Sequence, residues 1–201
     1  MRKNQKADIR KPEILEHFYR VLMQEGLEGA SIGKIANSMN IHPSLIIHYF
    51  KTKDNLMLAL TDLIVEKYQA PHFLKCFDEI DDPEQRFEAF LDTMFQESRV
   101  KTVSNRVFYA FYYLAHRNPE IRLRFVKMFS GFRNYVLAEL DFFKKQGIVK
   151  TVDLEMAADF IVTMIEGAAF HDAFLGEDKP FEGFGKYAKK ITKNLLTHGD
   201  G

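Results

Sequence analysis

Apolar side chains recur along most of the chain at the three- and four-residue spacing of amphipathic helices. Early in the chain they form a single helical stripe made of Ile14, Leu15, Phe18, Tyr19 and Leu22. The alternation of apolar and polar residues that marks a half-buried strand between two turns does not occur in the sequence. The pattern therefore predicts an all-α protein with about nine helices.

Prolines in first turns, polar capping residues and glycines predict where these helices begin and end. The first helix is expected to run from about Pro12 to Gln24, with Gly26 as its stop. The next helices are expected to begin near Ser31, Pro43, Lys53, Pro83, Pro119, Asp153 and Phe181. Pro71 interrupts the pattern of the fourth helix, so we expect a kink or break there.

Residues 31–50 have the proportions of a helix-turn-helix, with two short amphipathic helices joined by a tight turn at Asn40. The second helix is roughly 15 Å long, which suits the major groove of DNA. Its outward residues are expected to be His42, Pro43, Ser44, Ile47 and His48. Helix starts at Ser31 and Thr52–Lys53 offer backbone N–H groups to phosphates, and the basic arm Arg2–Lys11 adds cations. Because other three-helix bundles share this pattern, spacing alone leaves DNA binding open.

The charge of the chain is unevenly distributed, although its formal net value is +0. Residues 1–56 hold nine basic and six acidic side chains, whereas residues 57–201 hold nineteen basic and twenty-two acidic ones. Seventeen of the 19 phenylalanines also lie in the second part. We therefore expect two domains: a basic DNA-binding domain over 1–56 and a larger, acidic and aromatic helical domain over 57–201.

Two stretches near the N-terminus resemble TetR-type (tetracycline-repressor-like) transcriptional regulators. They are EGLEGASIGKIA at 25–36, similar to that family's junction between its first two helices, and IHPSLIIHYFKTKDNL at 41–56, similar to its recognition helix running into the fourth helix. The resemblance covers about residues 10–60. It implies that the DNA side of the motif includes Ser31, His42, Ser44, His48 and Tyr49, and that Lys53 meets a phosphate.

The predicted DNA-binding residues are Ser31, Lys34, His42, Pro43, Ser44, Ile47, His48, Tyr49, Thr52 and Lys53. Two of them depart from the family's pattern. Ile47 stands where the family usually has a tyrosine that touches the DNA backbone, and Pro43 stands where a lysine is common. Because Ile47 cannot donate a hydrogen bond, that contact is either lost or shifted to His48.

The larger domain has its densest aromatic block at Phe108–Tyr113. A helix that is aromatic nearly all round has contacts on several faces, either in a core or around an apolar cavity. The resemblance implies an effector pocket among the middle helices and a homodimer formed by the last two helices, where Gly167 permits close approach. The predicted pocket residues are Phe90, Met94, Phe108, Tyr109, Phe111, Tyr112, Phe129, Glu166 and Phe170.

The sequence offers no recognisable constellation for catalysis. Its seven histidines are not at metal-site spacings, and Cys76 is the only cysteine. Phosphate-binding glycine loops and nucleophile elbows are absent as well. We therefore expect no catalytic residues, no metal and no cofactor. The first eleven residues are too polar for a signal peptide, and no run of ~18 apolar residues occurs, so we expect a cytoplasmic protein without a membrane partner.

The leading hypothesis is a ligand-responsive transcriptional repressor. It binds a pseudo-palindromic double-stranded DNA operator as a homodimer and is released by a small apolar or aromatic effector. Two other hypotheses remain open from the sequence. One is a helical binding or interaction protein without sequence-specific DNA binding, and the other is an all-α enzyme acting on a hydrophobic substrate.

Overall fold

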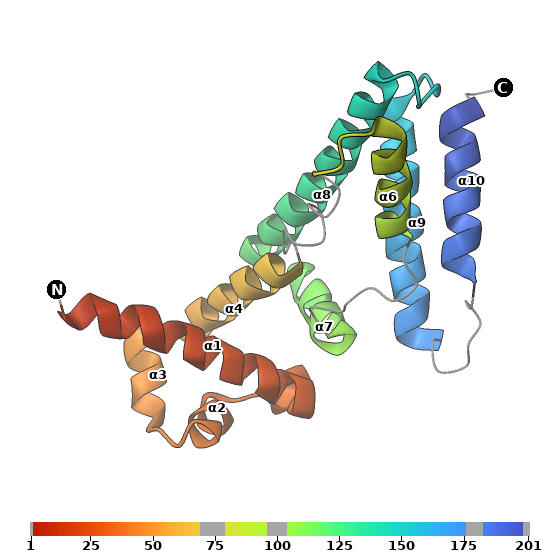
Figure 1. Cartoon of the computed structure of the whole chain (residues 1–201). Coiled ribbons are helices and arrows are strands. Elements are labelled where there is room, and N and C mark those ends of the chain that lie inside the picture. Colours follow the sequence, from red (N-terminus) through yellow and green to blue (C-terminus); the bar gives the residue numbers. More distant parts are fainter. Residues whose placement is uncertain (1, 69–78, 96–103, 176–182, 199–201) are drawn as a thin grey trace. The chain divides into compact units, whose positions relative to one another are not determined.

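The computed structural model describes residues 2–68, 79–95, 104–175 and 183–198 (Figure 1). Within these ranges every regular element is an α-helix, which confirms the predicted fold class. The helices are α1 (Arg2–Gly29), α2 (Ile32–Ser38), α3 (Pro43–Phe50), α4 (Lys53–Tyr68), α6 (Pro83–Met94), α7 (Asn105–Ala115), α8 (Pro119–Lys145), α9 (Leu154–Leu175) and α10 (Phe184–His198). The break expected at Pro71 lies outside the described residues.

The helices belong to two compact units, each with its own core. The first unit contains α1–α4, α7 and the start of α8 as far as Met128. The second unit contains α6, α9, α10 and the remainder of α8 from Phe129 onwards. The helix α8 is therefore continuous through the boundary between the units.

The helix α1 begins ten residues earlier than predicted, so the expected start at Pro12 is wrong. Pro12 lies inside the helix, although a proline there removes one backbone hydrogen bond. Most of residues 2–11 are good helix formers such as lysine, arginine, glutamine and alanine, and they continue the helix towards the N-terminus. At the other end the prediction is confirmed, because Gly26, with φ 72° and ψ −179°, interrupts the helical backbone.

Side-chain caps start α2 and α4 as the sequence predicted. The backbone N–H of Lys34 donates to Ser31 Oγ over 3.2 Å at the start of α2. The backbone N–H of Asn55 donates to Thr52 Oγ1 over 3.1 Å at the start of α4. Asn40, with φ 51°, makes the left-handed turn between α2 and α3. Local sequence thus determines where the helices of the DNA-binding motif begin.

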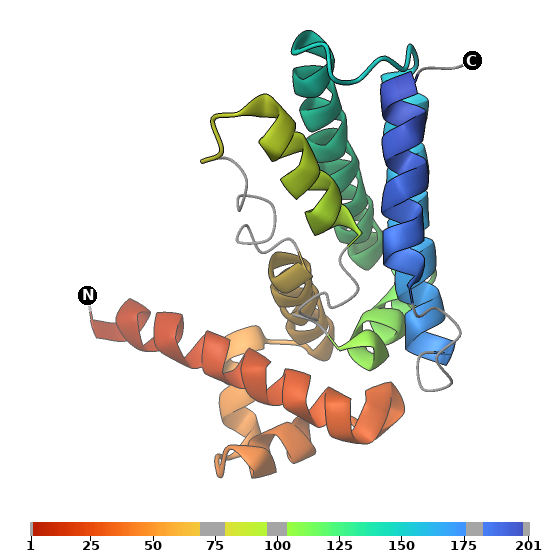
Figure 2. The ribbon, with the colours of Figure 1, turned by 45° about the vertical axis from the view of Figure 1, so that its right-hand side comes forward.

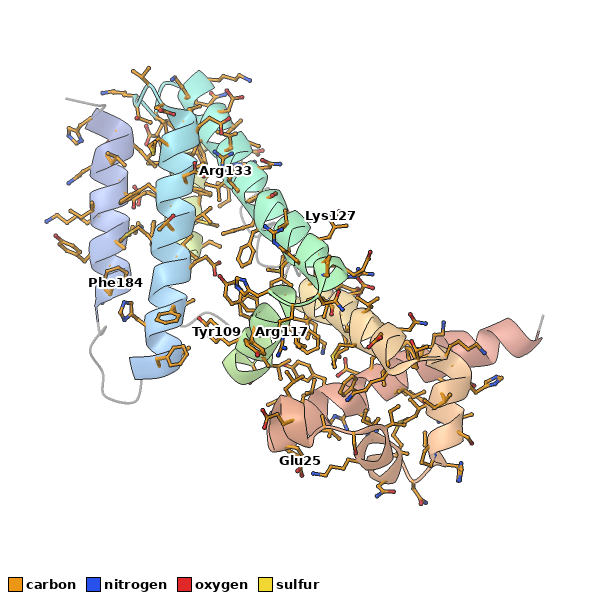
Figure 3. All side chains as sticks on the ribbon, turned by 180° about the vertical axis from the view of Figure 1, so that it is seen from behind. Glu25, Tyr109, Arg117, Lys127, Arg133 and Phe184 are labelled. Carbon is orange, nitrogen blue, oxygen red and sulfur yellow. The ribbon has the colours of Figure 1, made fainter. Side chains whose placement is uncertain are left out.

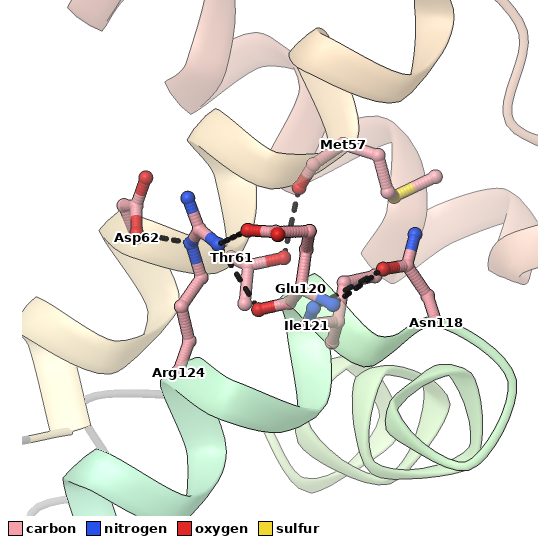
Figure 4. Close-up of polar contacts among 7 residues, drawn as sticks. All are labelled: Met57, Thr61, Asp62, Asn118, Glu120, Ile121 and Arg124. Atoms are coloured by element: carbon pink, nitrogen blue, oxygen red, sulfur yellow. Dashed lines mark hydrogen bonds and ion pairs between the residues drawn. The ribbon is translucent and has the colours of Figure 1, made fainter.

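The first unit is held together by an apolar core and by polar links from α1 and α4. The core includes Ile14, Phe18, Leu22, Ile35, Ala36, Ile46, Phe50, Leu56, Leu60 and Ile64. The backbone N–H of Ser104, just before α7, donates to the Tyr19 hydroxyl over 2.7 Å. The Arg124 guanidinium of α8 bonds both Asp62 of α4, over 2.6 Å, and Glu120, over 3.2 Å (Figure 4). Hydrogen bonding to Asp62 raises the pKa of Arg124.

The second unit packs α6, α8, α9 and α10 together (Figure 2). Its core includes several aromatic rings. The ring of Phe143 meets the rings of Phe87 and Phe90 at centroid distances of 5.1 and 5.6 Å. The helices α9 and α10 lie side by side and run in opposite directions, and the backbone N–H of Lys150 donates to the Leu196 carbonyl over 2.7 Å. This hydrogen bond joins the C-terminal end of α10 to the loop that leads from α8 into α9.

Charged pairs tie the helices of the second unit together. Lys189 of α10 lies 2.6 Å from Asp92 and 3.0 Å from Glu88 on α6. Hydrogen bonding to Lys193 holds the pKa of Glu88 below its ordinary value. Arg133 of α8, labelled in Figure 3, pairs with Glu155 and Asp159 at the start of α9.

A bidentate ion pair joins α6 to α8 inside the second unit. Arg86 Nη2 donates to Glu139 Oε1 over 2.9 Å and to Oε2 over 3.0 Å. The guanidinium also stacks over the Phe142 ring at 4.8 Å. Both side chains are mostly buried, with exposed fractions of 17% and 10%. Each charge therefore depends on the other for its stability in the interior.

We predict that Arg86→Ala lowers the free energy of unfolding by about 3–5 kcal/mol, because it leaves the Glu139 carboxylate buried without its counter-ion. Urea denaturation at a fixed protein concentration measures the effect. The double variant Arg86→Met, Glu139→Leu removes both charges and should be less destabilised than Arg86→Ala. Equal destabilisation of the two variants would contradict the assignment.

Candidate nucleic-acid interface

The turn between α2 and α3 places α3 with one face in the core and the opposite face exposed. Ile46 is fully buried and Phe50 nearly so, whereas Leu45 and Tyr49 are half-buried. The exposed positions are His42, Pro43, Ser44, Ile47, His48 and Lys51. On a helix of 3.6 residues per turn the side chains from Pro43 to His48 on this face span an arc of about 140°. The predicted outward face of the recognition helix is thus present.

His42 caps α3 with its imidazole ring. The backbone N–H of Ser44 donates to His42 Nδ1 over 3.3 Å, and Ser44 Oγ lies 2.8 Å from the same nitrogen. Because a backbone N–H can only donate, Nδ1 of the neutral ring accepts and its proton is on Nε2. This arrangement makes Nε2–H a hydrogen-bond donor for a base edge or a phosphate.

His48 and Tyr49 contact each other at the C-terminal end of the same helix. Their ring centroids are 5.4 Å apart and their planes are inclined by 76°, an edge-to-face arrangement. The half-buried tyrosine therefore supports the exposed imidazole. Ile47 lies between these rings and the cap and keeps 40% of its surface exposed.

Two helix starts flank the recognition helix. Ser31 is exposed at the start of α2, and Thr52 and Lys53 are exposed at the start of α4. The first turns of both helices present backbone N–H groups, which attract anions. The ammonium of Lys53 adds a positive charge at the start of α4, so this end of the unit suits phosphate groups.

Lys34 is placed differently from the other predicted DNA-binding residues. Its ammonium pairs with Glu25 of α1 over 2.5 Å (Figure 3 labels Glu25). This carboxylate partly neutralises the lysine and ties α2 to the end of α1. The sequence did not reveal the pair because the two residues belong to different helices.

One exposed cation next to the predicted set was missed from the sequence. Lys51 follows α3 with φ 70°, so the chain turns there in the left-handed region. It comes one turn after Ile47 and directly before the Thr52–Lys53 helix start. That position beside a predicted phosphate site is the signal that could have identified it.

The predicted pocket residues are divided between the two units. Phe108, Tyr109, Phe111 and Tyr112 belong to the first unit, and Phe90, Met94, Phe129, Glu166 and Phe170 belong to the second. In the first unit Phe108 and Phe111 are buried, Tyr109 is half-buried and Tyr112 is exposed. In the second unit Phe90 and Met94 share one core cluster, Phe129 and Glu166 are half-buried, and Phe170 is exposed. The pocket stays a prediction.

Two of these residues, Phe108 and Phe170, contact other aromatic rings. The Phe108 ring meets those of Tyr109 and Phe125 at centroid distances of 5.6 Å each. The Phe170 ring lies 4.8 Å from that of Phe174, one turn further along α9.

None of the described helices is both long and apolar enough to cross a membrane. Within the same parts of the chain, histidine, cysteine, aspartate and glutamate side chains do not gather into a group of three or more that could hold a metal ion.

Family comparison identifies both parts of the chain. Residues 14–60 match the family described as bacterial regulatory proteins, tetR family. Residues 82–197 match the family described as tetracyclin repressor-like, C-terminal domain. The second match alone covers more than half of the chain.

Individual proteins are similar over most of their lengths. The HTH-type transcriptional regulator PksA of Bacillus subtilis (strain 168) is 27% identical over 172 residues, which are 81% of this chain and 78% of that protein. The HTH-type transcriptional regulator BetI of Yersinia pestis (strain Pestoides F) is 24% identical over 171 residues, 84% of this chain and 83% of BetI.

Solved structures have the same fold. A TetR transcription regulator from Haloarcula marismortui superposes with a TM-score of 0.79 at 22% identity, covering 94% of this chain and 99% of that one. A putative transcriptional regulator from Saccharomonospora viridis, solved in complex with choline, gives 0.78 at 15% identity, covering 94% of this chain and 98% of that one. The resemblance noted in the sequence is thus confirmed, and the chain belongs to the TetR family of DNA-binding transcriptional regulators, a non-enzymatic family.

Proposed function

We propose that the protein is a repressor that binds a pseudo-palindromic operator as a homodimer and is released from it by a small apolar or aromatic effector. Residues 1–56 form the DNA-binding domain of this proposal, and residues 57–201 bind the effector and the second subunit. Such a repressor acts in the cytoplasm, on the DNA of its own cell. The observation that carries the proposal is the exposed face of α3, with the charged start of α4 beside it.

The contacts of the first unit suit a helix that enters the major groove. Ile46 and Phe50 hold α3 by one face, so His42, Ser44 and His48 are free of the core on the other. Lys51 and Lys53 are exposed at its C-terminal end, and their ammonium groups suit phosphates beside the groove. Polar groups for base edges and cations for the backbone are thus grouped on one face.

A homodimer is supported by apolar surface on the last two helices. On α9 the side chains of Met156, Phe170 and Phe174 are exposed at positions that share one helical face. On α10 Tyr187, Ile191 and Leu195 are exposed at four-residue intervals. Two adjacent helices that both expose apolar stripes are typical of a surface covered by another subunit.

Gly167 gives a second argument for the dimer. It lies in the exposed stripe of α9, and a Cβ added there would meet nothing within 4 Å. A glycine inside a helix costs roughly 1 kcal/mol relative to alanine, and among the described residues no neighbour lies close enough to require it. Close approach of a helix from a second subunit explains why the position has no side chain.

The effector is proposed to be apolar or aromatic because aromatic side chains are abundant in the helices beyond the DNA-binding motif. The similar regulator from Saccharomonospora viridis was solved in complex with choline, a small molecule with a quaternary ammonium group. Aromatic rings bind such cations as well as apolar groups. Choline is therefore a suitable first probe, alongside apolar and aromatic compounds.

Arg124 provides a physical link through which an effector can act on the DNA-binding helices. It joins α8 to Asp62 of α4, and α4 begins at Lys53 in the DNA interface. Because α8 continues from the first unit into the second, a shift of α8 is passed to α4 through this ion pair. An effector needs only to prefer the geometry that does not bind DNA.

We predict that Lys53→Ala weakens binding to all duplexes by a similar factor, because the contact is with phosphate. The slope of log affinity against log salt should decrease in magnitude by roughly 1 per subunit. Fluorescence anisotropy with a site selected from random duplexes, and with random duplex, gives both quantities.

Lys127→Ala is the matched control, since Lys127 is an exposed lysine of α8 outside the interface (Figure 3). Ser44→Ala should instead change sequence preference. If selection enriches no sequence, or if the salt slope of Lys53→Ala equals that of the wild type, the proposed mode of DNA binding is wrong.

For the dimer, Phe170→Glu is expected to shift the protein towards monomer, because it buries a charge in an apolar interface. Sedimentation velocity over a range of protein concentrations measures the equilibrium. Ser130→Glu, on the exposed surface of α8, should leave it unchanged. A wild-type protein that sediments as a monomer at all concentrations would refute the dimer.

For the effector response, Arg124→Ala should bind the selected site nearly as well as the wild type but respond less to the effector. The ratio of operator affinities without and with effector should shrink by about tenfold, the scale of coupling carried by such networks. Compounds are first chosen by operator release from the wild type, with choline among them. An unchanged ratio would show that this ion pair does not carry the coupling.

A further inference from the structure

The exposed face of α3 has one branched aliphatic side chain within it. Ile47 lies between Ser44, one turn before it, and Lys51, one turn after it, and all three are exposed. Its neighbour Ile46 is completely buried, and Phe50 keeps only 6% of its surface exposed. The core of the unit therefore takes its α3 contacts from Ile46 and Phe50, and Ile47 points to the side on which DNA binds.

An isoleucine at this position restricts what α3 can contact. The side chain has no donor or acceptor, so it cannot bond a phosphate or the polar edge of a base. When the helix enters the major groove, the Ile47 side chain loses its hydration. Its burial favours binding only if the side chain contacts an apolar group. Among the base edges of the major groove, the apolar group is the C5 methyl of thymine.

We propose that Ile47 is a specificity-determining residue that recognises a thymine by its C5 methyl group, at one position in each half-site. The inference rests on the proposed operator binding, and it adds the identity of one base. It also separates Ile47 from the phosphate contacts at the start of α4, because its side chain acts on the base and not on the backbone.

The neighbours of Ile47 are arranged to support this role. His42 is held by its cap to Ser44, and His48 is held against Tyr49. These polar side chains frame Ile47 from both directions along the helix, where they meet the bases next to the thymine. The β-branched side chain itself has restricted rotamers in a helix, so little conformational entropy is lost on contact.

The test uses the full-length protein and a site selected from a random duplex library. Each thymine of the selected site is replaced singly by deoxyuridine, which lacks only the C5 methyl. Replacement of this thymine in one half-site should weaken wild-type binding by about fourfold, the factor for burying one methyl-sized group, and replacement in both half-sites by about fifteenfold.

Variants connect this loss to Ile47. Ile47→Ala should bind the thymine site more weakly than the wild type and should show no further loss on deoxyuridine at that position. Ile47→Val should keep most of the discrimination. His48→Ala is the matched control on the same face, and it should remain sensitive to the methyl group even if its overall affinity falls.

Two results would overturn the proposal: wild-type affinity that is unchanged by deoxyuridine at every thymine, or an Ile47→Ala variant as sensitive as the wild type. A uniform loss in Ile47→Ala without any deoxyuridine effect would place the side chain against the sugar–phosphate backbone instead. Should Ile47→Ala fail to fold by circular dichroism, the wild-type and Ile47→Val series decide. Failure to enrich any sequence contradicts operator binding itself, which is a different outcome.

Discussion

The burial of one face of α3 is the constraint on which the DNA-binding surface depends. Ile46 and Phe50 occupy the core with α1 and α2, and this packing fixes the rotation of α3 about its own axis. A shift of one residue in that register would turn the helix by about 100° and carry Ile47 towards the core. Every contact proposed between α3 and DNA therefore follows from which two side chains of a short apolar run are buried.

Two residues, one on α3 and one on α9, point to partners outside the chain. Packing among the described residues does not account for Ile47 on α3 or Gly167 on α9: Ile47 exposes apolar surface, and Gly167 lowers helix stability without relieving a clash. We propose that each is explained by a molecule outside the chain, which is DNA for α3 and a second copy of the protein for α9.

The charged side chains of the second unit and of the DNA-binding motif differ in whether they are paired or exposed. Many charged side chains of the second unit are paired with each other, as in Lys189 with Glu88 and Arg133 with Glu155. In the DNA-binding motif Lys34 is paired with Glu25, whereas Lys51 and Lys53 extend from exposed positions at the end of α3 and the start of α4. Zero net charge is thus compatible with binding an anion, because local arrangement and not the total decides where a phosphate is attracted.

Much of the DNA-binding motif was predictable from the sequence because its determinants are local. The cap at Ser31, the turn at Asn40, the stop at Gly26 and the outward face of α3 each depend on residues within one or two turns of each other. The wrong start at Pro12 shows the limit of that logic, since a proline that can begin a helix can also lie within one.

Contacts between residues on different helices were decided only by the tertiary structure. The pairing of Lys34 with Glu25 and the ion pairs Arg124–Asp62 and Arg86–Glu139 each join side chains on different helices, and the backbone N–H of Ser104, just before α7, bonds the Tyr19 hydroxyl of α1. No local pattern selects such partners, because the distance between them depends on how whole helices pack. The sequence alone determined most of the helices, their caps and the exposed face of α3, because these depend on neighbouring residues, and the packing of the helices determined which charges are paired and which stay exposed.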